Sequence, residues 1–297
     1  MKKTAFLLSV VMIITSCFFK LNTNAETNKY YKEFYVSADG NDNGDGSQQS
    51  PFRTIERAKQ EVKKYNAKMT GDIAVNILGG TYYQTESIDF LTEDSGFNGY
   101  NVIYRGIDAP IISGGRLICG FVPSSRKDGV YELYLPQYLN KGIFELYNAD
   151  GGKRRLAKSD KLVKPNGDYN NPSTNYSADG MLFNKDDLPD LQNLNDSEFV
   201  WYRGWNVRKL HPQSITTVGE NKAVSFYNPV YDEIYKDTTY NATKISSSVS
   251  CCLQNDFSLL DTPGEFYYDT NTGYLYYMPL AFENIETESF IVPTLDT

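Results

Sequence analysis

The sequence predicts a mainly β protein that begins as a parallel solenoid and continues into an antiparallel β unit. Between about residues 72 and 115, short apolar runs recur roughly every ten to fifteen residues, a rhythm typical of solenoid coils with a few short strands each. A single amphipathic helix is predicted before these runs. After about residue 120, alternating runs separated by Asn, Asp and Gly turns replace that rhythm, which favours hairpins.

The predicted helix follows a first strand and a loop rich in Gly, Asn and Asp. Tyr35-Val36-Ser37 has the β-branched and aromatic character of a strand, and residues 39–46 cannot continue it because their residue types prefer turns. Ser50-Pro51 indicates an N-cap and a first helical residue, after which apolar residues recur at helical spacing up to Tyr65. Such a helix is suited to cover the unpaired edge at the open end of a solenoid.

The strands expected of the two parts follow in order along the chain. Those of the solenoid are residues 73–78, 87–91, 101–105 and 110–113. Those of the antiparallel unit are residues 130–135, 143–147, 153–158, 198–202, 213–218, 223–227, 251–253, 264–268 and 274–278. We interpret residues 165–179 as a surface loop, residues 186–191 as a helical turn and residues 289–293 as a further coil strand. An antiparallel sandwich has similar strand lengths, and the helix before the strands favours the solenoid.

The first stretch resembles the opening coil of secreted right-handed parallel β-helix proteins. The likeness rests on residues 40–46 (GNDNGDG) and on residues 51–58 (PFRTIERA). It implies the start of a right-handed parallel β-helix with an N-terminal capping helix. Lyases, hydrolases and non-catalytic surface proteins share this opening, so the resemblance indicates a fold more than a chemistry.

Later motifs resemble those of glycoside hydrolase family 141. They are residues 150–157 (DGGKRRLA), residues 259–269 (LLDTPGEFYYD) and residues 272–279 (TGYLYYMP). The sequence departs from the family pattern at Phe266, where Trp is usual, and at Lys158-Ser159, where Arg-Tyr is expected. The order of these motifs implies that an antiparallel β unit is inserted between solenoid coils.

The resemblance implies three parts and a function. Residues 30–118 are expected to form parallel β-helix coils with the capping helix, residues 119–285 an inserted β-rich domain, and residues 286–297 a return to the β-helix. In the family, later coils carry the catalytic carboxylates, so a chain that stops at residue 297 is expected to be the N-terminal portion, truncated before them. The implied protein is an exported, carbohydrate-active part of a β-helix glycoside hydrolase acting on complex polysaccharide, inactive on its own.

Two alternatives stay open. One is a non-catalytic carbohydrate-binding or cell-surface β-helix module, which would bind a glycan without turnover. The other is a pectate-lyase-like protein, which needs Ca²⁺ and a Lys or Arg base. The resemblance over residues 263–269 (PGEFYYD) argues against the lyase.

The N-terminus and the charge limit the location and the partners. Residues 1–25 are predicted to be a signal peptide with a cleavage site after Ala25, and a lipoprotein signal with Cys17 as the lipidated residue is the alternative. The protein is therefore expected to be secreted or held at the cell surface. Its apolar run is shorter than the roughly 20 residues of a membrane span. The net charge of −8 argues against a nucleic-acid partner.

One aromatic and cationic cluster is a candidate substrate-binding site. Strand alternation places Trp201, Arg203 and Trp205 on one face, where they could form a platform for a sugar ring. Packing of the inserted unit against the solenoid is the more ordinary use of such residues. No residue is assigned a catalytic role. Glu265 and Asp269 share a strand face but lie roughly 13 Å apart, too far for the carboxyl pair of a glycosidase.

Metal and thiol chemistry find little support in the sequence. An EF-hand register in the loop at residues 41–52 ends on Phe52 instead of Glu, so that interpretation fails, and a structural Ca²⁺ ion held in another way stays open. Cys119, Cys251 and Cys252 are expected to be small buried apolar residues. His211, the only histidine, is expected to lie in a loop. No other cofactor is implied.

Overall fold

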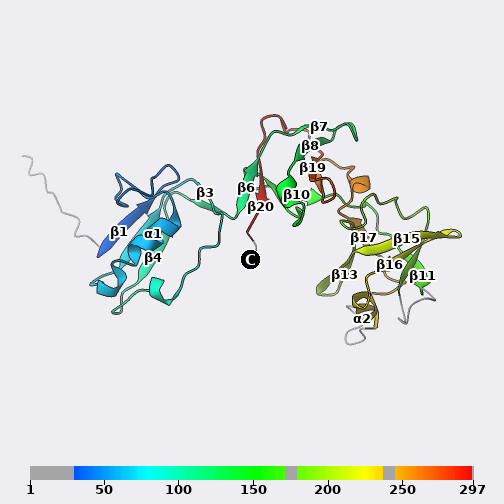
Figure 1. Ribbon diagram of the computed structural model, residues 1–297, viewed down its shortest axis with the longest axis horizontal. Helices are drawn as coiled ribbons and strands as arrows, with labels where there is room; N and C mark the ends of the chain where they lie inside the picture. Colours follow the sequence, from blue (N-terminus) through cyan, green and yellow to red (C-terminus); the bar gives the residue numbers. More distant parts are fainter. Residues whose placement is uncertain (1–29, 171–178, 237–244, 296–297) are drawn as a thin grey trace, which may run out of the picture. The chain divides into compact units, whose positions relative to one another are not determined.

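A computed structural model describes residues 30–170, 179–236 and 245–295 of the chain, in two compact units (Figure 1). The first unit ends with residues 88–111, and the second contains residues 83–87 and everything from Ile112 onward. Residues 115–118 belong to a sheet of the second unit. The predicted signal peptide, residues 1–25 with Cys17, lies outside the described residues.

The first unit is built on three parallel strands in register, β1 (Lys32–Val36), β2 (Ile73–Ile77) and β4 (Val102–Gly106). β3 (Thr81–Tyr83) pairs with β5 (Ile111–Ser113). The parallel pairing agrees with the direction expected for this part. The prediction of a strand at residues 87–91 is wrong, because these residues form no strand. There the Leu91 amide donates to the Asp94 carboxylate at the start of a 3₁₀ turn, η2 (Thr92–Asp94), so it is not available for a sheet.

The helix α1 (Ile55–Val62) begins later and ends earlier than the sequence predicts. Its N-cap is Thr54, whose hydroxyl accepts from the Arg57 amide, because Phe52 still pairs with the strand β1 through the Tyr35 carbonyl. The Asp42 carboxylate accepts from the amides of Arg53 and Thr54 and so fixes the loop to the helix start. A second 3₁₀ turn, η1 (Asn66–Lys68), follows the helix.

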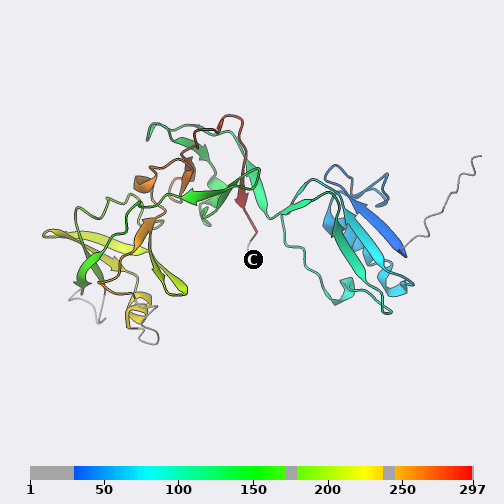
Figure 2. The same ribbon diagram turned by 180° about the vertical axis from the view of Figure 1, so that it is seen from behind.

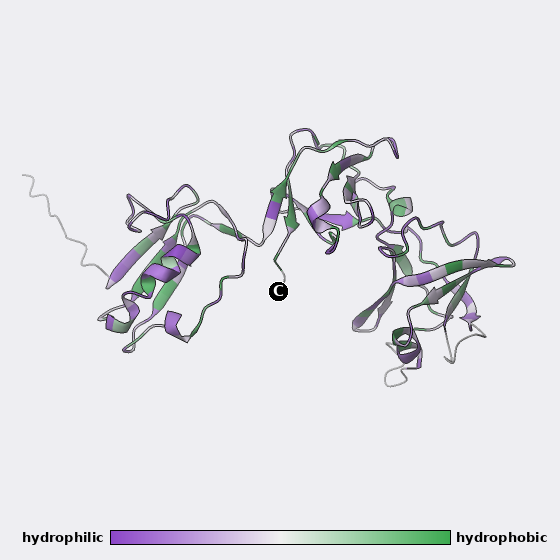
Figure 3. Cartoon of the chain, in the orientation of Figure 1, coloured by the Kyte–Doolittle hydropathy of each residue, from purple (hydrophilic) through white to green (hydrophobic). Residues whose placement is uncertain are grey.

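The apolar face of α1 packs on the sheet of the first unit, and its other face is hydrophilic (Figures 2 and 3). Ile55, Ala58 and Val62 from the helix pack against the buried residues of β1 and β2. Phe52 is fully buried in the same core, where the Arg57 guanidinium lies 4.3 Å from its ring centre. The helix therefore covers one face of this sheet.

The second unit contains an eight-stranded sheet in the order β6-β20-β9-β10-β18-β19-β8-β7. All neighbours in it are antiparallel except β10 and β18. The strand bounds are β6 (Gly115–Ile118), β7 (Val122–Pro123), β8 (Tyr131–Tyr134), β9 (Leu146–Asn148), β10 (Lys153–Leu156), β18 (Glu265–Asp269), β19 (Tyr274–Tyr277) and β20 (Phe290–Pro293). Residues 148–152 form the hairpin turn between β9 and β10. β20 was expected to begin a parallel coil, but it pairs antiparallel with β6 and β9.

Two smaller antiparallel sheets complete the second unit. The first has the order β11 (Pro165–Tyr169), β12 (Gly180–Asn184), β16 (Asn221–Phe226) and β15 (Pro212–Val218). The second has the order β14 (Asn206–Leu210), β13 (Glu198–Arg203) and β17 (Cys252–Gln254). The antiparallel pairing expected for this part is thus found. The surface loop expected over residues 165–179 is wrong at its start, because residues 165–169 form the strand β11. The helix α2 (Val230–Lys236) was not predicted.

Strands β18 and β19 form a wall between two hydrophobic cores of this unit. Phe266 and Tyr268 point into one core with Leu275 and Tyr277, while Tyr267 and Tyr276 point into the other. All residues of β18 are buried because both faces of the sheet are covered here. We call the core that contains Tyr267 and Tyr276 the insert core.

The cysteines test one further expectation. Cys251 and Cys252 are buried as expected, and burial raises the pKa of both thiols, but Cys119 is exposed, so its expected burial is wrong. Within residues 30–170, 179–236 and 245–295, no helix has the length and apolar character that crossing a membrane requires.

Candidate functional site

The first residue of the predicted sugar platform, Trp201, lies inside the protein. Its side chain is fully buried in the insert core, and its indole N–H donates to the Val249 carbonyl at 3.2 Å. The ring stacks on Phe199 and meets the edge of Phe226. Trp201 is a packing residue, and its ring is not available to a sugar.

The end of the strand separates Trp205 from Trp201, whereas Arg203 is the last residue of the strand. β13 ends at Arg203, and Gly204 then turns the chain with a φ of 50°, in the left-handed region that favours glycine. Trp205 is 73% exposed in this turn. The three residues do not form the single exposed face that strand alternation predicts. The strand ends before Gly204, and the face of β13 that carries Trp201 is the buried one. The exposed aromatic residue of the strand is Tyr202, opposite Val207 of β14.

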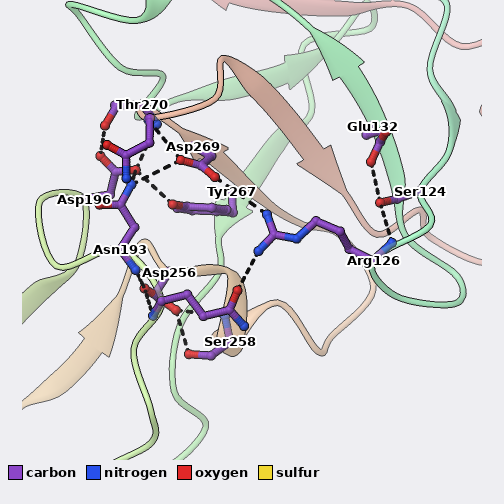
Figure 4. A network of polar contacts seen from close by, with 12 residues as sticks. Ser124, Arg126, Glu132, Asn193, Asp196, Asp256, Ser258, Tyr267, Asp269 and Thr270 are labelled. Carbon is purple, nitrogen blue, oxygen red and sulfur yellow. Dashed lines mark hydrogen bonds and ion pairs between the residues drawn. The ribbon is translucent and has the colours of Figure 1, made fainter.

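A buried polar network links the insert core to the eight-stranded sheet (Figure 4). At its centre the Asp196 carboxylate accepts hydrogen bonds from the Asn193 amide group at 2.6 Å, the Tyr267 hydroxyl at 2.9 Å and the Thr270 amide at 3.0 Å. The Thr270 hydroxyl donates to its other oxygen. Burial is the main cause that raises the pKa of the Asp196 carboxyl, and the neighbouring Asp269 carboxylate adds to it.

Asp269 and Asp256 extend this network. The Asn193 amide group that donates to Asp196 also lies 3.2 Å from Asp269, whose other oxygen is 3.6 Å from the Arg126 guanidinium. Arg126 itself lies over the ring of Phe257, with 3.8 Å between guanidinium carbon and ring centre. One oxygen of Asp256 accepts from the amides of residues 192 and 193 and from the Ser197 hydroxyl, and the other accepts from Ser258 at the start of η4 (Phe257–Leu259).

The two carboxylates Asp196 and Asp269 are close but not placed for glycoside hydrolysis. Such a pair must face a sugar from the two sides of an open cleft. Both residues are buried, and both accept hydrogen bonds from protein donors, so the network links the insert core to the eight-stranded sheet. Glu265, also weighed in the sequence, is buried apart from them against the Arg155 guanidinium at 2.7 Å.

An open cleft of about 650 Å³ lies elsewhere in the second unit. Its walls are residues 83–85, 115–117, 137–138, 141–145 and 292–295, which come from the end of β3, from β6 and β20, and from the region after η3 (Pro136–Tyr138). Two of the wall residues are half-exposed aromatic rings, Tyr83 and Phe144. The volume is within the range of about 300–1,000 Å³ that is usual for ligand sites.

The charged groups of the cleft are mostly positive. Arg116 of β6 and Lys141 face it together with one carboxylate, Glu145. Glu145 is already engaged, because Lys153 pairs with it at 2.5 Å and the Tyr147 hydroxyl donates to it at 3.0 Å. The hydrogen bond from Lys153 holds the pKa of Glu145 below its usual value, so this carboxylate stays ionised and paired.

Tyr138 contributes a buried ring to the cleft wall. Its side chain packs edge-on against Tyr268, and its hydroxyl has no hydrogen-bond partner among the residues that the structure describes. Burial raises the pKa of this hydroxyl, and the positive charge of Arg116 opposes that rise. Arg116 and Tyr138 line the same cleft.

Replacing Tyr138 with phenylalanine is expected to increase the free energy of unfolding by about 1 kcal/mol, because the change removes a buried hydroxyl that has no partner. The control is Tyr268→Phe, which removes a hydroxyl that donates to the Leu135 carbonyl at 2.9 Å and should destabilise by a similar amount. Urea unfolding of both variants measures this. A loss of stability in Tyr138→Phe would mean that its hydroxyl is paired.

The described residues show no cluster of three or more His, Cys, Asp or Glu side chains that could hold a metal ion. The loop at residues 40–46 is where the sequence allows a structural calcium ion. Two of its side chains accept hydrogen bonds from backbone amides. Asn41 accepts from the Asn43 amide, and Asp45 accepts from the Ser47 amide. The Nδ1–H group of His211 donates to the Ser197 carbonyl, 3.1 Å away, next to the strand β15.

The chain was compared with known proteins. Residues 173–280 match the family model described as the GH141 insertion domain. A solved structure described as a glycoside hydrolase has the same fold over 90% of this chain, with a TM-score of 0.74 and 23% sequence identity, and the chain covers 46% of that protein. A structure of XylC with xylose matches at a TM-score of 0.30 and 11% identity over 75% of this chain and 31% of that one, too weak to carry an argument. No curated protein matches.

The cleft and the polar network were not found from the sequence. Both are assembled from segments far apart in the chain, such as Tyr83, Arg116 and Val292 at the cleft. No local motif marks them. The match over residues 173–280, in contrast, agrees with the family resemblance of the sequence motifs in the same region.

Proposed function

We propose that this chain is the glycan-binding, N-terminal part of an exported β-helix glycoside hydrolase of the family 141 kind that acts on complex polysaccharide. The insertion domain over residues 173–280 and the fold shared with a glycoside hydrolase support the family. Export is supported by the signal-peptide pattern of residues 1–25. The observation that carries the proposal is the open cleft of the second unit.

The cleft has the chemistry that sugars need. Sugar rings have apolar C–H faces and a rim of hydroxyl groups, so they bind where aromatic rings stand beside polar groups. Tyr83 and Phe144 offer exposed aromatic surface, and Gln84, Gln137 and Arg116 lie in the same walls. The cleft could hold a short stretch of a glycan chain.

Hydrolysis by this part alone is not expected. Retaining and inverting glycosidases both need two carboxyl groups at the scissile bond, about 5–5.5 Å or 6.5–9.5 Å apart. Glu145 is the one carboxylate in the walls of the cleft that the structure describes, and it is paired with Lys153. The described part of the cleft therefore lacks the second catalytic group.

Affinity electrophoresis of the full chain in gels containing xylan, pectin or fucosylated glycans tests this proposal. We expect at least one glycan to retard the protein and none to release reducing sugar. Phe144→Ala should weaken the retardation about tenfold, because the substitution removes an exposed stacking surface. The matched control is Phe282→Ala, which removes a ring that is 83% exposed outside the cleft and should change nothing. Retardation by none of the glycans would contradict the proposal, and so would turnover by the purified chain.

A further inference from the structure

We propose that the cleft takes a glycan through the carboxylate of an acidic sugar, with the guanidinium of Arg116 as the partner of that carboxylate. This inference rests on the proposed glycan binding and names the class of sugar. It is drawn from the charges of the cleft, from the position of Arg116 and from the aromatic rings beside it.

The charge balance of the cleft is opposite to that of the chain. The whole chain carries a net charge of −8, whereas the described walls of the cleft hold the guanidinium of Arg116 and one carboxylate, Glu145. That carboxylate is neutralised by Lys153. Most of an acidic surface repels a negatively charged polymer. Such a polymer is therefore expected to bind where the surface carries a positive group, as the cleft does at Arg116.

Arg116 is placed to meet a ligand. It is exposed on β6, a strand at the edge of the eight-stranded sheet, opposite Val292 of β20, which is also a wall residue. No carboxylate of the described residues pairs with its guanidinium. Arginine binds carboxylates through two parallel N–H···O bonds, which gives both affinity and orientation.

The aromatic rings favour a sugar acid over a small inorganic anion. Tyr83 and Phe144 stand in the same cleft, so a ligand that fits must present an apolar face as well as an anionic group. A uronic acid residue has both, because its ring has C–H faces and its C6 carbon is a carboxylate. Phosphate and sulfate ions have only the charge.

Calorimetric titration of the full chain with matched ligand pairs tests the inference. The ligands are hexamers of galacturonic acid and of mannuronic acid and a xylo-oligosaccharide that carries glucuronic acid, each compared with its own methyl ester. The ester keeps the sugar and removes the charge. We expect at least one acid to bind about tenfold or more tightly than its ester, since the ester loses the charged hydrogen bonds to the guanidinium. We also expect that difference to shrink at high salt.

Arg116→Gln should abolish the preference for the acid while the unfolding midpoint stays unchanged, because the side chain is exposed. The control is Arg53→Gln, which removes an exposed arginine of the first unit and should leave the preference intact. Equal affinity for acid and ester would overturn the inference and leave glycan binding standing. An equal loss in both variants would also overturn it, because the preference would then be general electrostatics. If no acid, ester or neutral glycan binds, both this inference and the proposed function fail.

Discussion

Replacing Trp201 with alanine is expected to lower the free energy of unfolding by about 3–5 kcal/mol, as is usual for a large aromatic residue removed from a core. The ring is fully buried between Phe199 and Phe226, and its N–H donates to the Val249 carbonyl. The substitution leaves a cavity and removes the donor to that carbonyl.

Trp205→Ala is the matched control, because Trp205 is 73% exposed in the same five-residue stretch. Its removal should change stability by less than about 0.5 kcal/mol. Urea unfolding followed by far-UV circular dichroism measures both variants, and affinity electrophoresis measures their glycan binding. A stable Trp201→Ala variant that no longer binds glycan would show that the sugar platform predicted from the sequence exists after all.

The two tryptophans show that the sequence predicts the position of this strand but not which of its faces is buried. The residue types of the stretch indicate a strand over residues 198–202, and β13 (Glu198–Arg203) agrees. The sequence does not indicate which face is buried, because Phe199, Val200, Trp201 and Tyr202 make both faces apolar. The three-residue platform then depended on alternation continuing through Gly204, whose left-handed conformation ends it.

The helix shows a similar limit. Ile55, Ala58 and Val62 were expected on one face and are all buried on the sheet. Its start was placed at Ser50-Pro51, because these residue types are common at helix starts. The actual start depends on tertiary contacts. Phe52 pairs with β1 across the loop, and the Asp42 carboxylate holds the amides before the helix. Contacts of this kind join residues ten or more positions apart, and local propensity carries no information about them.

The sequence predicts strand direction correctly for the regularly spaced strands of the first unit, but not for the last strand. β2 and β4 come from the regular solenoid rhythm, and they are parallel as expected. The last strand, β20, has the residue pattern of a coil strand, but β6 and β9 offer it antiparallel partners, and the residue pattern of a short buried strand is the same in both cases. The cleft depends on this pairing, because β6 and β20 supply two of its walls.

The Asp196→Ala variant is expected to lose about 3 kcal/mol of unfolding free energy, because four donors lose their shared acceptor inside the protein. Asp196→Asn should lose much less. Its amide oxygen can accept from the Thr270 amide and from Asn193, and its NH₂ group can donate to the Thr270 hydroxyl. Urea unfolding followed by fluorescence measures the effect. In a Trp205→Phe background, Trp201 is the only remaining tryptophan and reports on the insert core directly.

The pH dependence separates the charge of Asp196 from its hydrogen bonds. Burial raises the pKa of this carboxyl in the folded protein above its ordinary value of 3.8, so the folded state binds the proton more tightly than the unfolded state does. The stability that comes from this difference is present below the ordinary value and is lost as pH rises through the raised pKa. The native chain should therefore lose stability relative to Asp196→Asn, which does not titrate, as pH rises from about 3.8 through that pKa towards 7. A difference between the two proteins that grows in favour of the native chain over the same range would mean that the network stabilises the ionised carboxylate and lowers its pKa.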